Sequence, residues 1–130
     1  GIIQRMENKN DYIDFFNEEI EYRRQLKYPP FGNFFVVLFT GVDYNLTVRL
    51  LEELHFIMEH YNKNNQFTLL GPMPATISKI NNKYRYQIVV KSTEETKLKN
   101  YVLYCINKLK TRQKLDKINI GLYFNPNHSV

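Results

Sequence analysis

The chain has 130 residues, of which 43% are hydrophobic and 24% are charged. This length suits one globular domain, and this composition argues against intrinsic disorder. The longest apolar run, Phe34 to Phe39, is far too short to cross a membrane, so no membrane partner is expected. The single cysteine, Cys105, excludes an internal disulfide and fits a reducing compartment.

The charge is distributed unevenly along the chain. Residues 1–64 carry seven Lys/Arg and ten Asp/Glu, a net charge of −3, whereas residues 65–130 carry eleven and three, a net charge of +8. A basic half favours a polyanionic partner, of which nucleic acid is the commonest inside cells. The competing interpretation is an ordinary solvated surface, which charge alone slightly favours.

The first half of the chain predicts helix, strand, helix. An accessory helix is expected over residues 11–27, ended by Pro29 and Pro30 because proline cannot continue it. Asn33 to Thr40 reads as an apolar strand that is central in its sheet or covered on both faces. A second helix over residues 44–63 has apolar residues at three- and four-residue steps.

The second half predicts two extended pieces, Phe67–Leu70 and Ala75–Ile80, separated by a kink at Gly71–Pro74. Asn81-Asn82 is a plausible hairpin turn, since asparagine tolerates a left-handed backbone. Residues 83–91 alternate as a strand, residues 94–111 form a helix capped by Ser92 or Thr93, and a last strand runs from Ile118 to Phe124.

The order after the accessory helix is therefore β-α-β-β-α-β. Two right-handed crossovers then give an α+β, ferredoxin-like sandwich with a four-stranded antiparallel sheet and both helices on one face. We expect a single domain over residues 1–130, with the ferredoxin-like core at 33–126 and the extra N-terminal helix outside it. Because the chain begins with Gly1 and not methionine, we also expect a fragment of a longer protein.

No arrangement of residues points to catalysis. His55 and His60 are five apart on a helix and face different sides, and Cys105 falls on a buried stripe. Gly71–Ala75 lacks the lysine and the amide donors of a phosphate loop. No catalytic residue, cofactor or metal site is therefore expected.

The predicted strand over 83–91 carries the candidate binding residues. Tyr84 and Tyr86 share a face with Ile88 and Val90, so we expect the tyrosines in the core and not on a base-stacking platform. The opposite face is expected to point outward and to contact phosphates. The candidate nucleic-acid-binding residues are Lys79, Lys83, Arg85, Gln87 and Lys91, with Arg23 and Arg24 as second candidates.

Four motifs together carry a family resemblance. They are the segment from Glu18-Glu19 through Arg23-Arg24, then Tyr28-Pro29-Pro30-Phe31-Gly32, Gly71-Pro72-Met73-Pro74-Ala75 and Tyr84-Arg85-Tyr86-Gln87. Over roughly residues 11–126, the chain resembles the C-terminal domains of the primosomal protein N′ (PriA) family of bacterial replication-restart DNA helicases.

The resemblance implies a non-catalytic domain that binds forked or single-stranded DNA and docks on the helicase lobes of the same chain. The parent protein would be a cytoplasmic, nucleoid-associated, ATP-dependent 3′-to-5′ DNA helicase of bacteria. ATP with Mg²⁺ and zinc would be bound by upstream domains, with no cofactor in this fragment. Single-stranded DNA-binding protein and other primosome proteins are further implied partners.

Two other functions remain open from the residues. One is an RNA-binding or ribosome-associated ferredoxin-like domain, which a preference for RNA over forked DNA would reveal. The other is a small-molecule sensor or small enzyme, which would need a pocket with convergent polar groups.

Overall fold

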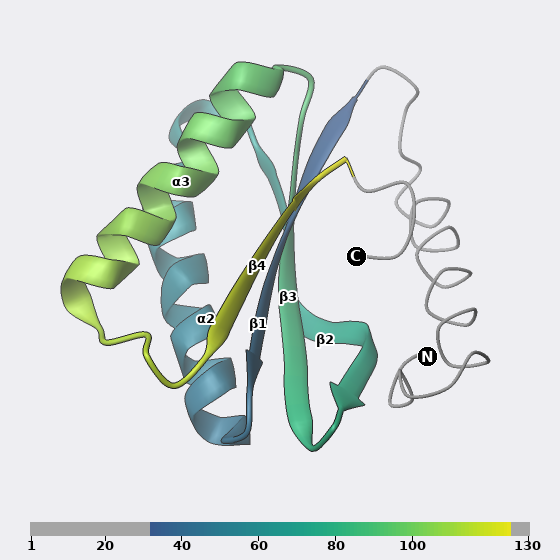
Figure 1. Cartoon of the computed structure of the whole chain (residues 1–130). Helices are drawn as coiled ribbons and strands as arrows, with labels where there is room; N and C mark the ends of the chain where they lie inside the picture. The colour runs from purple at the N-terminus through teal and green to yellow at the C-terminus, as the bar shows by residue number, and fades with distance from the viewer. Residues whose placement is uncertain (1–31, 126–130) are drawn as a thin grey trace.

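A computed structural model describes residues 32–125 of the chain. The accessory helix expected over residues 11–27, and the turn from Tyr28 to Phe31, lie outside the described residues. The described elements are β1 (Asn33–Gly41), α2 (Tyr44–His60), a short 3₁₀ helix η1 (Lys63–Asn65), β2 (Thr68–Ile80), β3 (Lys83–Ser92), α3 (Glu95–Arg112) and β4 (Asn119–Phe124) (Figure 1).

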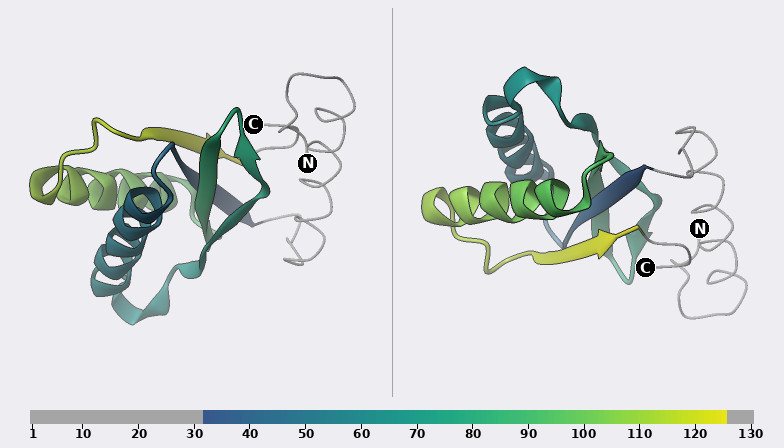
Figure 2. Two further views of the ribbon diagram at one scale, coloured as in Figure 1. Left: turned by 90° about the horizontal axis from the view of Figure 1, so that it is seen from below. Right: turned by 90° about the horizontal axis from the view of Figure 1, so that it is seen from above.

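The four strands form one antiparallel sheet in the order β2-β3-β1-β4. Both helices cover the same face of this sheet, as the two further views show (Figure 2). This is the ferredoxin-like sandwich predicted from the β-α-β-β-α-β order, and the prediction of the fold class is confirmed.

β1 is buried on both of its faces, which explains its unbroken apolar sequence. Phe35, Val37 and Phe39 pack beneath the helices in the main hydrophobic core. Phe34 and Val36 point to the opposite face, where they form a second apolar cluster with Val89. The sequence prediction for this strand is confirmed in its stronger form, because β1 is both central and covered on both sides.

Each helix buries the stripe that its spacing predicts. The buried residues of α2 are Thr47, Leu50, Leu51, Leu54, Ile57 and Met58. Those of α3 are Leu98, Tyr101, Val102, Cys105, Ile106 and Leu109. α2 ends at His60, and the following asparagine, Asn62, bonds both the N–H and the carbonyl of Phe67 through its side chain.

The predicted cap of α3 is wrong by one or two residues. Glu94 occupies the N-cap position and makes no capping hydrogen bond with its own side chain. Ser92 instead accepts the N–H of Glu94 with its hydroxyl at 3.0 Å, just before the helix begins. The hydroxyl therefore orders the approach to α3 but does not satisfy a helical N–H.

β2 is one strand and not two separate pieces, but its ladder to β3 is broken where the kink was predicted. Register shifts fall between Leu70 and Met73 and between Pro74 and Lys79. Proline lacks the N–H that a continuous ladder needs, so Pro72 and Pro74 are tolerated only because β2 is an edge strand. Gly71 has φ +103°, and a Cβ there would meet the carbonyl oxygen of Gln87 at 2.7 Å.

The hairpin between β2 and β3 forms as predicted. Asn81 and Asn82 have φ of 50° and 64°, the left-handed pair of a two-residue type I′ turn. The turn places Lys79 across the ladder from Tyr84 and Ile80 across from Lys83. Basic and aromatic side chains are thereby held at one end of the sheet.

α2 begins at that same end, and Asp43 caps it. The Asp43 carboxylate accepts the N–H of Leu46 at 3.0 Å. Replacing Asp43 with alanine leaves this donor without its acceptor, so the free energy of unfolding should fall by about 1 kcal/mol in urea denaturation. Asp43→Asn keeps a good capping oxygen, so its free energy of unfolding should fall much less. An equal loss of stability in both variants would contradict the capping role of Asp43.

Candidate nucleic-acid interface

The structure separates the candidate binding residues instead of lining them up. Lys79 and Lys83 are exposed at the hairpin end of the sheet. Lys91 is half-buried near the other end of β3, eight residues from Lys83, or about 26 Å at the rise of an extended strand. Arg23 and Arg24 lie outside the described residues.

Arg85 and Gln87 do not face solvent, so the prediction that they point outward is wrong. Their side chains are 6% and 7% exposed. The alternation along β3 was assigned correctly, but its second face is covered as well, since Val89 on that face is fully buried in a cluster with Phe34 and Val36. An alternating pattern identifies two faces and does not show that the polar one is open.

Arg85 is a buried structural cation. Its Nη1 donates to the carbonyl oxygen of Ile77 at 2.8 Å, joining β3 to the irregular part of β2 where the ladder is shifted. Burial lowers the pKa of Arg85 from 12.5 to about 10, slightly opposed by Tyr123. The guanidinium therefore stays charged at neutral pH while it is held in the protein interior.

Three tyrosines gather at the hairpin end and form what we call the tyrosine cluster: Tyr44, Tyr84 and Tyr86. The ring of Tyr44 meets those of Tyr84 and Tyr86 edge to face, with centroids 5.3 Å and 5.6 Å apart. Tyr84 and Tyr86 face the helices, as predicted, but both are only half-buried. Tyr44 is the first residue of α2, so the helix covers Tyr84 and Tyr86 only partly, and Tyr44 itself is 45% exposed.

One lysine contacts the tyrosine cluster, and two more line a pocket at the same end of the sheet. The Lys79 ammonium lies 4.9 Å from the centre of the Tyr84 ring, a cation–π contact. Lys83 lines a small pocket of about 160 Å³ together with Lys117, which comes from the loop between α3 and β4. Asp116 lines the same pocket, so the two lysines are partly balanced by one carboxylate.

This combination has a known chemical use. Aromatic rings offer faces to bases, and neighbouring lysines offer donors to phosphates, which is how proteins hold single strands without reading their sequence. Sequence reasoning named Lys79 and Lys83 as candidates but named neither Tyr44 nor Lys117, which the structure brings to the same end of the sheet. The sequence holds no signal for either, because both are brought to the hairpin end only by the crossing of α2 and by the α3–β4 loop.

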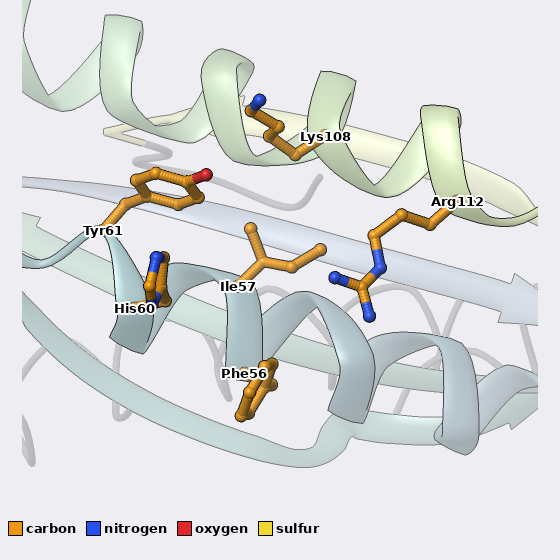
Figure 3. A pocket seen from close by; sticks show the side chains of 6 residues that line it. All are labelled: Phe56, Ile57, His60, Tyr61, Lys108 and Arg112. Carbon is orange, nitrogen blue, oxygen red and sulfur yellow. The ribbon is translucent and has the colours of Figure 1, made fainter.

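A second concave surface lies between the two helices, on the side away from the sheet (Figure 3). It has a volume of about 260 Å³ and is lined by Phe56, Ile57, His60, Tyr61, Lys108 and Arg112. Arg112 is already paired with Glu53, Nε to Oε2 at 2.7 Å. The pocket therefore combines aromatic and apolar side chains with two basic ones, of which Arg112 is already paired.

Other kinds of site are not found in the described part of the chain. Between residues 32 and 125, no group of three or more His, Cys, Asp or Glu side chains is placed to hold a metal ion. Cys105 is fully buried, and burial raises the pKa of its thiol to about 12, which makes it a poor nucleophile. No helix within this range is long and apolar enough to cross a membrane.

Comparison with protein families agrees with the motifs. The family model of the primosomal protein N C-terminal domain matches residues 24–123, which include all the described strands and helices except the last residue of β4, Phe124. The chain belongs to this family. Among curated proteins, it is 26% identical to replication restart protein PriA of Bacillus subtilis over 118 residues, and 30% identical to that of Borreliella burgdorferi over 112 residues.

These alignments cover 90% and 82% of the chain but only 14% and 16% of the two relatives. The chain thus spans about a seventh of the length of the curated relatives it matches. A solved structure of the de novo designed protein Foldit4 covers 73% of the chain with a TM-score of 0.54, and the chain covers 97% of it. At 7% identity, this likeness concerns the fold alone.

The burial of Arg85 gives a stability prediction. Arg85→Ala removes a charged donor from a buried carbonyl and should lower the free energy of unfolding by about 2 kcal/mol in urea denaturation. Lys83→Ala removes the same charge from an exposed site two residues away, and it should change the free energy of unfolding by less than about 0.5 kcal/mol. Equal effects of the two changes would mean that Arg85 is not the buried tie described above.

The tyrosine cluster gives a titration prediction. Tyr86 donates its hydroxyl hydrogen to Tyr44 at 3.1 Å, and this bond is the first cause that raises the pKa of Tyr86 from 10.0 to about 12. The bond stabilises the protonated phenol, so Tyr44→Phe should lower the pKa of Tyr86 toward 10.0, as followed by NMR of its hydroxyl-bearing ring carbon. Tyr84→Phe leaves the bond intact and should leave that pKa high.

Proposed function

We propose that the chain is the DNA-binding and docking C-terminal domain of a replication-restart protein and that it contacts forked or single-stranded DNA. The observation that carries this proposal is the family match over residues 24–123, because the relatives in that family are named for replication restart. The lysines and tyrosines at the hairpin end supply a surface with suitable chemistry.

On this proposal, binding is mainly electrostatic. Lys79, Lys83 and Lys117 reach solvent at one end of the sheet and donate to phosphates. Contacts of this kind hold any sequence alike, which suits a domain that recognises the form of a DNA structure. Lys91, at the far end of β3, and the Arg23-Arg24 pair are further candidates for phosphate contact.

The domain itself would be non-catalytic. Its hairpin end offers donors and aromatic faces and no pairing of a nucleophile with a base. A parent helicase would carry ATP with Mg²⁺ and zinc in upstream domains, and this domain would dock on the helicase lobes. Single-stranded DNA-binding protein and other primosome proteins are proposed partners, in the bacterial cytoplasm.

An RNA-binding domain remains the alternative, because RNA offers the same phosphates and bases. Competition between a forked DNA and an RNA hairpin of equal length and charge separates the two. Preference for the fork supports replication restart, and preference for the RNA overturns the proposal.

The binding surface is tested by removing two charges and comparing salt dependence. Replacing Lys79 and Lys83 together with alanine should weaken binding to single strands of every sequence and flatten the slope of log K against log salt by about 1.4, since each phosphate contact contributes about 0.7. Fluorescence anisotropy over a series of salt concentrations measures both quantities.

A matched control changes the same number of charges elsewhere. Lys97 and Lys99 are paired with Glu94 and Glu95 at 3.3 Å and 3.1 Å near the start of α3. Replacing both with alanine should leave the slope nearly unchanged. An equal effect of the two double variants would show that net charge, and not the hairpin end, determines binding.

A further inference from the structure

Tyr44 is an exposed aromatic ring held in a fixed position. It is 45% exposed, yet two neighbouring rings meet it edge to face at 76° in each case, and its hydroxyl accepts a hydrogen bond from Tyr86. The capping bond of Asp43 also fixes the backbone at the start of α2. A ring held in this way loses little conformational freedom when a ligand stacks on it.

The surroundings of Tyr44 indicate what would stack there. The Lys79 ammonium lies over the ring of Tyr84, and Tyr84 contacts the exposed ring of Tyr44. A cation therefore lies close to the exposed Tyr44 ring. A nucleobase joined to a phosphate presents a flat π-face next to a negative charge, which is the complement of this arrangement.

Only an unpaired base can use this surface. In a duplex the faces of the bases are stacked on one another, whereas the phosphates stay accessible to lysines. The lysines would therefore bind both forms of DNA, and the tyrosine cluster would add affinity for the single-stranded form alone. The two contributions can be measured separately.

We propose that Tyr44 is a stacking site for an unpaired nucleobase, positioned by Tyr84 and Tyr86, with Lys79 on the neighbouring phosphate. This inference rests on the proposed function, because it names the form of nucleic acid that the hairpin end prefers. On this inference, the preference for single-stranded over duplex DNA comes from one side chain, Tyr44, which contacts the base.

The test compares three DNA ligands with the full 130-residue chain and its variants. The ligands are a thymidine oligonucleotide, an abasic strand of the same length and charge, and a duplex. The wild-type chain should bind the thymidine strand about tenfold more tightly than the abasic strand, in line with the affinity that one stacked base adds.

Three variants isolate the ring. Tyr44→Leu keeps apolar bulk against Tyr84 and Tyr86 but removes the π-face, and it should lose the tenfold preference while binding the abasic strand and the duplex as before. Tyr44→Phe keeps the ring and should keep the preference. Phe56→Ala removes a ring that is 64% exposed on the same helix but far along it, and it should also keep the preference.

The outcomes separate this inference from the function on which it rests. If the wild-type chain binds DNA but binds the thymidine and abasic strands equally well, the stacking site is overturned and DNA binding stands. A preference that survives in Tyr44→Leu also overturns it. If the wild-type chain binds none of the three ligands, the proposed function fails and the stacking site fails with it.

Discussion

The burial of β1 on both faces is the constraint on which the rest of the fold depends. A strand with an unbroken apolar run, here Phe34 to Phe39, must be covered on both faces, so the two helices on one face are not sufficient. On the second face, Phe34 and Val36 pack with Val89, and Leu70 and Met73 of β2 and Tyr123 of β4 pack against them. A one-residue slip of β1 would exchange the two sets of side chains, so this double burial also makes its register with β3 and β4 costly to change.

That constraint explains the error about Arg85. The face of β3 that carries Arg85 and Gln87 continues the face of β1 that carries Phe34 and Val36, because β1 and β3 are neighbours in register. Since the β1 side is buried, the adjoining β3 residues are also drawn out of solvent. The guanidinium is tolerated there because it donates to the carbonyl of Ile77, at a part of β2 where prolines break the ladder.

Most of the fold could be predicted from the periodicity of the sequence, whereas the make-up of the candidate nucleic-acid interface could not. The apolar stripe of α2 repeats every three to four residues and is buried, and Cys105 of α3 lies on a buried stripe as predicted. The turn at Asn81-Asn82 follows from local backbone preference. The position of Tyr44 over Tyr84 and Tyr86, in contrast, depends on where α2 crosses the sheet, which is set by tertiary packing and leaves no periodic signal in the sequence.

The same packing limits how this domain can hold a single strand. An RNA-recognition motif, which shares the topology, stacks bases on aromatics of the open sheet face. Here Phe34, Val36 and Val89 on that face are exposed by 5% or less, so the two central strands offer no such platform. The rings of Tyr84 and Tyr86 belong instead to the face beneath the helices, and they are accessible where α2 begins. On the proposed function, a single strand of DNA would therefore contact the end of the sheet, beside the β2–β3 hairpin, and not lie across the sheet.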